Sequence, residues 1–378
     1  MVWTDGAAGI PLSQELLDQL TAQIPGAERL DMAEALGALP GIEYGTEREL
    51  GAFLLPVLRE KGLELSQRQR EELERGWTVL CALGQLVLAR TARLLRYADL
   101  AAAMNLEAIR GELGAFDDRL HRLARPYPGQ IDCAENIRRL TAGSEMTCDK
   151  GRFAFGYDKA PRVQDAICVR ATPQTHGGVR DVFSFAQRQL RADMSEGEAT
   201  MARAELALSA LLTALADLAH ISERRAFRLN DTHLSYGLPM NLVVGDVGIN
   251  HGFPVVQSTQ AALVAELKLL LLPAPLLRVG EESTAYLSLC KTLKAIELAE
   301  RVLAVEILMA AQGMDIVSSA LPQFSFGGGT SAAHRCLRSR VAVLTENRFM
   351  VPDMAAALEL LQNGVILSAA EDAVGALR

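Results

Sequence analysis

The sequence predicts an all-α protein, and three observations lead to that prediction. The 378-residue chain is 49% hydrophobic but only 5% aromatic, which favours packed helices over a β-sandwich built from β-branched and aromatic residues. Apolar residues recur at helical spacing along several long stretches, and no run of alternating strands is present. No internal repeat with a period of about 20–50 residues is present either. We therefore expect an elongated helical bundle.

In the first half of the chain, residues 1–60 predict short helices joined by Gly/Pro turns. Apolar residues at helical spacing predict one long helix over 63–105. The segment RPYPGQ, residues 125–130, predicts a turn, and a helix over 130–144 closed by Gly143 follows it. Residues 145–162 predict a polar loop.

In the second half, the pattern predicts long helices over about 177–192, 196–221, 253–272 and 283–312. The connection over 229–253 is long for a compact helical protein, and such loops are usually functional. The apolar run over 267–277 contains two prolines and is shorter than the roughly 20 residues that span a bilayer, so it predicts a buried helix end. A Gly-rich loop leads into a final pair of helices.

Charge and cysteine usage narrow the class of protein. The net charge of −8 at pH 7 favours solubility and argues against a general nucleic-acid surface. The six cysteines are scattered without a CxxC pair, as expected for reduced thiols in a cytosolic protein. The N-terminal residues MVWTDGAAGIPLSQ lack the basic and apolar regions of a signal peptide. We therefore expect a cytoplasmic protein that binds neither nucleic acid nor membrane.

Standard catalytic motifs are absent from the sequence. The segment FGGGT, residues 326–330, precedes a predicted helix without a strand or a lysine, which favours a flexible turn over a phosphate cradle. The histidines are isolated, so no metal site is expected.

The segment VQDAICVRATPQTHGG, residues 163–178, is the strongest candidate for a site. Pro173 and Gly177 bracket QTH, so we expect the chain to turn there and His176 and Arg170 to face one cavity. An arginine in a mostly apolar segment suits bidentate binding of a carboxylate. The alternative is a structural ion pair between Arg170 and Asp165, and spacing alone does not decide between the two.

The segment GINHGF, residues 248–253, is a second candidate, because it leads from a Gly-rich loop into a predicted helix. Asn250 is placed to cap that helix, and His251 lies near its positive end. The alternative is a capping asparagine beside an exposed histidine. The arginines of SERR, residues 222–225, predict structural pairing near a helix C-terminus.

Several blocks, in order, resemble the aromatic amino-acid ammonia-lyase family, nearest to its histidine ammonia-lyases. The stretch ending in RPYPGQ is similar to the family's RPHPGQ turn, and VQDAICVRATPQTHGGVRD resembles its QDxYSLRCxPQVHG. SERRAFRLNDTHLSYGLPMNLV, GINHGFPVVQSTQAALVAELK and TENRFMVPDMAAALELLQNG resemble three further blocks. The resemblance covers residues 62–378 as a lyase-like bundle and leaves residues 1–61 without a clear counterpart.

The resemblance implies an α-helical bundle, usually a tetramer, whose active sites are each built by three subunits. It also implies a methylidene-imidazolone electrophile made from an internal Ala-Ser-Gly, and removal of ammonia from histidine, phenylalanine or tyrosine. Gln164 and Arg170 correspond to residues that hold the substrate there, the arginine by its carboxylate. Asn250 and Phe253 also match the family's blocks.

Several of the family's functional positions are changed. No Ala-Ser-Gly is present in the 378 residues. The family's NGTQ becomes RGWT, with Arg75 in place of the asparagine, and Arg75 is a further substrate-binding candidate beside Asn250 and Phe253. Its tyrosine becomes Ile167, and Thr284 stands where it has a glutamate. We therefore expect no self-made cofactor, and classical ammonia-lyase activity is not expected from this chain alone.

Three hypotheses follow. The first is a cofactor-free biosynthetic lyase acting on a carboxylate or acyl thioester, with Arg170 binding the carboxylate and His176, His251 or Tyr286 as acid–base candidates. The second is a pseudoenzyme that binds a ligand or regulates. The third is one subunit of a hetero-oligomeric lyase. For the first two we expect a homo-oligomer, either tetramer or dimer.

Overall fold

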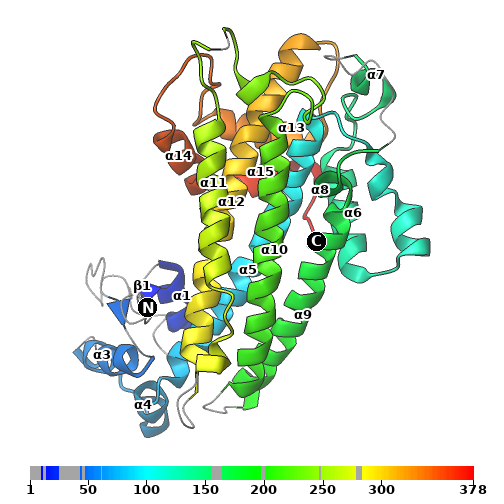
Figure 1. The fold of residues 1–378 in the computed structure, drawn as a ribbon. Helices are drawn as coiled ribbons and strands as arrows, with labels where there is room; N and C mark the ends of the chain where they lie inside the picture. The colour runs from blue at the N-terminus through cyan, green and yellow to red at the C-terminus, as the bar shows by residue number, and fades with distance from the viewer. Residues whose placement is uncertain are drawn as a thin grey trace. The chain divides into compact units, whose positions relative to one another are not determined.

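The chain is helical in the computed structural model (Figure 1), which describes residues 10–11, 14–24, 43–44, 47–60, 62–154, 164–196, 201–246, 248–277 and 283–378. In these ranges the strands are β1 (Ile10–Pro11) and β2 (Glu43–Tyr44), which pair antiparallel with Ile10 opposite Tyr44. The other regular elements of the described residues are helices. The predicted all-α class is therefore confirmed.

The chain divides into two compact units, and each is built from three stretches of sequence. The first unit comprises Met1–Ala92, Val182–Thr213 and Leu270–Ile296, and the second comprises Arg93–Asp181, Ala214–Leu269 and Glu297–Arg378. The boundary expected between residues 61 and 62 rests on resemblance and not on compactness, so it stays a prediction.

Four helices are long: α5 (Trp77–Ala108), α9 (Thr172–Glu196), α10 (Ala202–Leu229) and α12 (Ala285–Ala320). The single helix predicted over 63–105 is wrong at its start. A separate helix, α4 (Gln67–Glu74), begins with a capping box at Ser66 and ends at Arg75. Gly76 follows with a φ of +77°, a conformation that glycine adopts without steric penalty, and this breaks the helix before α5.

Short helices complete the first unit: α1 (Gln14–Gln23), α3 (Glu47–Glu60) and the 3₁₀ turn η5 (Ala274–Leu277). The leucines of α1 and α3 supply buried apolar side chains, including Leu16, Leu20 and Leu54. Helices α3 and α4 approach closely at Gly51, where a Cβ atom would lie 1.9 Å from the carbonyl oxygen of Leu73. This close packing requires glycine.

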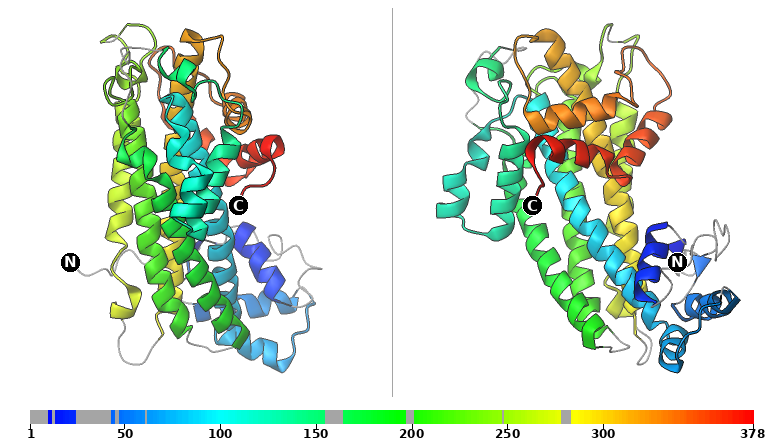
Figure 2. Two further views of the ribbon diagram at one scale, coloured as in Figure 1. Left: turned by 90° about the vertical axis from the view of Figure 1, so that its right-hand side faces the viewer. Right: turned by 180° about the vertical axis from the view of Figure 1, so that it is seen from behind.

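The second unit holds the candidate site, and many of its elements are short. They are η2 (Leu113–Phe116), η3 (Leu120–Ala124), α6 (Pro128–Leu140), α7 (Asp149–Arg152), α8 (Ile167–Arg170), η4 (Met240–Leu242), α11 (Pro254–Leu269), α13 (Gly328–Arg338), α14 (Val351–Gln362) and α15 (Val365–Val374). Helices α13 and α15 pack against each other and against α6 (Figure 2). The predicted turn at RPYPGQ is short, because Pro128 already starts α6.

The turn expected between Pro173 and Gly177 is wrong, because both residues lie inside α9. Pro173 is the second residue of the helix, where its missing N–H is not needed. Gly177 is required by packing: a Cβ atom there would lie 2.6 Å from the backbone nitrogen of Gln130. A Cβ atom on Gly129 would in turn lie 2.3 Å from the carbonyl oxygen of Gly177. The two glycines let α6 and α9 approach closely.

The apolar run over 267–277 is not the buried helix end that was expected. Helix α11 ends at Leu269, and Leu272 and Leu276 are 53% and 72% exposed. Three other helices, α5, α10 and α12, are long and apolar enough to span a bilayer by length and composition. Between 61% and 78% of their most apolar windows is buried inside the protein, so intramolecular packing already covers most of that apolar surface.

The Gly-rich segment over 326–330 is packed and is not the flexible turn that was expected. Gly327 caps α13, and a Cβ atom on it would lie 2.4 Å from the Cα atom of Thr141. Its backbone N–H donates to the buried carboxylate of Glu107 at 2.8 Å, and the hydroxyls of Ser144 and Thr330 donate to the same carboxylate. Burial raises the pKa of Glu107 to about 7, against the lowering effect of these three donors.

Candidate functional site

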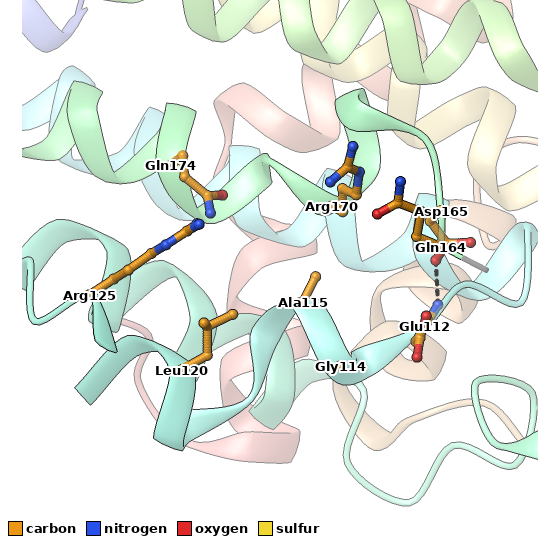
Figure 3. A pocket seen from close by; sticks show the side chains of 9 residues that line it. All are labelled: Glu112, Gly114, Ala115, Leu120, Arg125, Gln164, Asp165, Arg170 and Gln174. Carbon is orange, nitrogen blue, oxygen red and sulfur yellow. Dashed lines mark hydrogen bonds between the residues drawn. The ribbon is translucent and has the colours of Figure 1, made fainter. Parts of the chain in front are cut away.

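A pocket of about 260 Å³ lies in the second unit, between the η2–η3 segment and the start of α9. Figure 3 shows its lining side chains. The lining residues are Glu112, Gly114, Ala115, Leu120, Arg125, Gln164, Asp165, Arg170 and Gln174. The pocket is small, and six of these nine lining residues are polar or charged, which suits a compact ligand with polar groups.

One end of the pocket is formed by Arg170, the last residue of α8, and by Gln164. Figure 3 shows the Gln164 amide beside the Arg170 guanidinium. Within the described residues, the guanidinium of Arg170 has no hydrogen-bond partner, and its Nε atom is buried. A buried donor without a partner is unfavourable, so this end of the pocket favours an acceptor supplied by a ligand.

Asp165 is buried, and its carboxylate accepts a hydrogen bond of 2.5 Å from the backbone N–H of Glu112. This bond ties the segment before α8 to the segment before η2, and so fixes the pocket wall. Burial of Asp165 is therefore explained by a structural role.

Arg125, which follows η3, faces Gln174 of α9 at the other end of the pocket (Figure 3). The hydrogen-bond network assigns the Gln174 amide with its oxygen accepting from Arg125 Nη1 and its nitrogen donating to the carbonyl of Ala171 at 3.3 Å. Arg125 is exposed, whereas Gln174 is half-buried. The side chain of Gln174 thus holds an exposed arginine toward the pocket.

His176 does not line the pocket, so the expectation that it and Arg170 face one cavity is wrong. Gln174 and His176 are two residues apart on α9, so their side chains leave the helix in different directions. His176 is 1% exposed, and its Nδ1 atom lies 2.8 Å from Asp99 Oδ1. Burial lowers the pKa of His176, against the raising effect of Asp99.

His176 belongs to a buried ion-pair cluster. Asp99 also pairs with Arg180 and accepts a hydrogen bond of 2.8 Å from Asn136. Burial raises the pKa of Asp99, but the nearby Arg180 and His176 lower it by more. The resulting pKa is about 2, so the carboxylate is ionised at neutral pH. Arg225 forms two hydrogen bonds to Glu306, of 2.5 and 2.8 Å. The predicted structural role of the SERR arginines is thereby supported.

Three groups in this cluster, Asp99, Cys133 and His176, bring possible metal-ligand atoms within 4.8 Å of one another. The surroundings disfavour a cation there, because the positive side chains of Arg180 and Arg225 contact Asp99 and His176. Burial also raises the pKa of Cys133 well above its ordinary value, so the thiol stays protonated. The geometry suits an ion-pair cluster better than a metal centre.

The second sequence candidate lies apart from the pocket. Asn250 does not cap α11: its side chain accepts a hydrogen bond of 3.1 Å from the backbone N–H of Asn347. Asn347 accepts in return from the N–H of His251 at 2.7 Å. The side chain of His251 is exposed, and Phe253 is buried directly before α11. The crevice beside Asn250 has no room for a water molecule, so this segment is a structural junction.

Arg75 and Tyr286 belong to the first unit, and the pocket is built by the second. Arg75 is the exposed C-terminal cap of α4. Tyr286 is half-buried in the first turn of α12, where it hydrogen-bonds the thiol of Cys290, and burial raises the pKa of that thiol to about 12. Their expected roles in catalysis and substrate binding stay predictions.

Three polar pocket residues were missed by sequence reasoning: Glu112, Arg125 and Gln174. Arg125 precedes the first proline of RPYPGQ, a segment that was considered only as a turn. Gln174 lies in the strongest candidate segment, but it too was considered only as part of a turn. A helical assignment over residues 167–174 would have placed the side chains of Arg170 and Gln174, which are four residues apart, on one face.

Comparisons with known proteins identify the family. The family model for aromatic amino acid lyases matches residues 32–339. A histidine ammonia-lyase of Sorangium cellulosum is 36% identical over 344 residues, which are 83% of this chain and 64% of that protein. The chain thus spans about two thirds of the length of such relatives.

Solved structures agree with this result. A tyrosine aminomutase from Streptomyces globisporus has a TM-score of 0.81 at 27% identity, covering 98% of this chain and 84% of that one. A histidine ammonia-lyase from Trypanosoma cruzi has a TM-score of 0.76 at 25% identity, covering 98% and 80%. With the family model matching most of its residues, this chain belongs to the aromatic amino acid lyase family.

Proposed function

We propose that this protein is a lyase that binds a small carboxylate or acyl-thioester substrate in the pocket at Arg170. The observation that carries the proposal is the guanidinium of Arg170, which lines the pocket and has no partner within the described residues. Arginine binds a carboxylate through two parallel hydrogen bonds, and partial burial strengthens such bonds. The Gln164 amide beside it adds a donor for the same group.

The family resemblance implies an electrophile made from an internal Ala-Ser-Gly, so its fit to this chain needs a test. The tripeptide Ala-Ser-Gly does not occur in the 378 residues. Ile167, which stands where the resemblance places a tyrosine, is 68% exposed and carries no ionisable group. The residues of this chain therefore do not supply the electrophile, and no step is assigned to it.

In the proposed reaction, the pocket residues act by binding and by proton transfer. Arg170 fixes the carboxylate and withdraws charge from the adjacent carbon, which favours loss of its proton. The electron pair of that C–H bond then forms a carbon–carbon double bond as a leaving group departs from the next carbon, and the reverse steps give the addition. Glu112 is the pocket carboxylate that is not buried, and it is the group placed to exchange that proton. His176 supplies no proton to the pocket, because its ring is enclosed in the ion-pair cluster.

A second candidate is a carboxylate-binding protein without catalysis. It is favoured by the position of His176 and His251, the two histidines expected to act as acids or bases, which do not line the pocket. A third candidate, a subunit of a hetero-oligomeric lyase, is favoured because these 378 residues contain no Ala-Ser-Gly, which a second subunit would then supply. Native mass spectrometry of protein isolated from its own host separates these: a second chain supports the third candidate, and a homo-oligomer excludes it.

Carboxylate binding is tested by isothermal titration of the purified protein with valerate, a simple monocarboxylate. We expect the Arg170→Ala variant to bind valerate at least tenfold more weakly, because it loses a charge-assisted bond worth about 1.5–3 kcal/mol. Arg188→Ala is the matched control, since Arg188 is exposed on α9 and does not line the pocket. Equal affinity of both variants for valerate would contradict the proposal.

Catalysis is tested separately in deuterated buffer, by following proton exchange at the carbon next to the carboxylate of valerate or next to the thioester carbonyl of its thioester. Exchange by the wild-type protein that is lost in Glu112→Gln supports the lyase. Binding without any exchange supports the non-catalytic protein instead.

A further inference from the structure

We propose that the pocket takes a ligand with two anionic groups, a short-chain dicarboxylate, held at one end by Arg170 and at the other by Arg125. This inference rests on the proposed function, because it accepts Arg170 as the site of the first carboxylate. It adds a second recognition point and thereby names the substrate class.

The two ends of the pocket are built alike. Each has one arginine and one glutamine amide: Arg170 with Gln164, and Arg125 with Gln174. Figure 3 shows the two pairs well separated, with Ala115, Gly114 and Leu120 lining the space below and between them. A single carboxylate uses the arginine at one end, so the arginine at the other end is left for another acceptor.

The contacts of the charged lining residues leave hydrogen-bond donors for an anion at both ends of the pocket. The two acidic side chains, Glu112 and Asp165, formally balance the two arginines. Asp165 is engaged by the backbone N–H of Glu112, and Glu112 lies 3.9 Å from the guanidinium of Arg152. Within the described residues, Arg125 bonds to Gln174 and Arg170 has no partner, so both arginines keep donors for a ligand.

The hydrogen bonds of Gln174 also support a second anion site at Arg125. Its amide oxygen accepts from Arg125, and its nitrogen is satisfied by the carbonyl of Ala171. Arg125 uses one donor in this bond and keeps the others, because a guanidinium carries five N–H groups. Preorganisation by Gln174 reduces the side-chain entropy that Arg125 loses when a ligand binds.

The inference is tested by isothermal titration with glutarate and with valerate, which have the same number of carbon atoms but two and one carboxylates. We expect the wild-type protein to bind glutarate at least tenfold more tightly than valerate. Arg125→Gln should reduce the affinity for glutarate to that for valerate and leave valerate unchanged. Arg170→Gln should weaken both ligands.

The outcomes separate this inference from the proposed function. If valerate binding depends on Arg170 but glutarate binds no more tightly, the second recognition point is wrong and the proposed function stands. If neither ligand binds, both are wrong. Thermal melting of each variant checks folding, and Arg125 is exposed, so its replacement leaves the core unchanged. Arg119→Gln is the control for charge alone, because Arg119 is exposed on the same segment and pairs with Asp117.

Discussion

The buried ion pair between Arg225 and Glu306 allows a quantitative test of how the second unit is stabilised. Their side chains are 1% and 0% exposed, and two hydrogen bonds join them. Replacing Arg225 by Met leaves the carboxylate of Glu306 buried without its partner, and breaking such a pair destabilises a protein by about 3–5 kcal/mol. That is a large share of the roughly 5–15 kcal/mol by which a domain is stable. We expect urea denaturation, followed by circular dichroism, to show this loss.

The double variant Arg225→Met, Glu306→Leu removes both charges and should be more stable than Arg225→Met, because no unpaired charge is left buried. Arg340→Met is the matched control: Arg340 pairs with Glu359 at 3.1 Å, but both side chains are about half exposed, so the loss should stay below about 1 kcal/mol. A single variant that loses less than about 1 kcal/mol, or a double variant as unstable as the sum of its singles, would refute the reasoning.

Two further predictions concern packing and pH. Gly177→Ala should destabilise the protein, by about 1–3 kcal/mol in thermal or urea unfolding, because a Cβ atom would lie 2.6 Å from the backbone of Gln130. Gly178→Ala, with nothing within 4 Å of its Cβ position, should be neutral or stabilise by about 0.5–1 kcal/mol, and equal effects of the two changes would exclude close packing as the cause. Because the pKa of Glu107 is raised to about 7 in the folded protein from 4.5, the folded state holds a proton that the unfolded state has lost. Stability should therefore fall as pH rises from about 4.5 to about 7, and Glu107→Gln should show a smaller decline in urea unfolding over that range.

Most of the fold could be predicted from the sequence, because long amphipathic helices leave a strong periodic signal. The helices over 202–229 and 285–320 were expected from that periodicity, with ends misplaced by several residues. The start of α9 was missed for a physical reason: Pro173 and Gly177 favour a turn locally, yet proline is also suited to a first helical turn, and glycine to close helix packing. The approach of α6 that requires Gly177 depends on distant residues and leaves no local signal.

The candidate site was predictable only where residues lie close in sequence. Arg170 and Gln164 were found together, within one segment of the chain. Arg125 was missed, because it reaches the pocket only when α6 and α9 pack at their glycines. His176 was expected at the cavity, since sequence spacing does not distinguish a histidine facing solvent from one enclosed by Asp99 and Arg225.

The buried cluster also explains how the pocket keeps its shape. Arg225 lies 3.4 Å from Thr172 Oγ1 and 3.4 Å from His176 Nε2, so it contacts the first turns of α9 at two points. Arg170 lies two residues before Thr172, and Gln174 lies two residues after it, so both pocket side chains extend from the part of the chain that Arg225 holds. Loss of Arg225 should therefore weaken ligand binding as well as stability, although it does not line the pocket. Loss of Arg170 should weaken binding alone, and this difference separates a residue that positions the site from one that contacts the ligand.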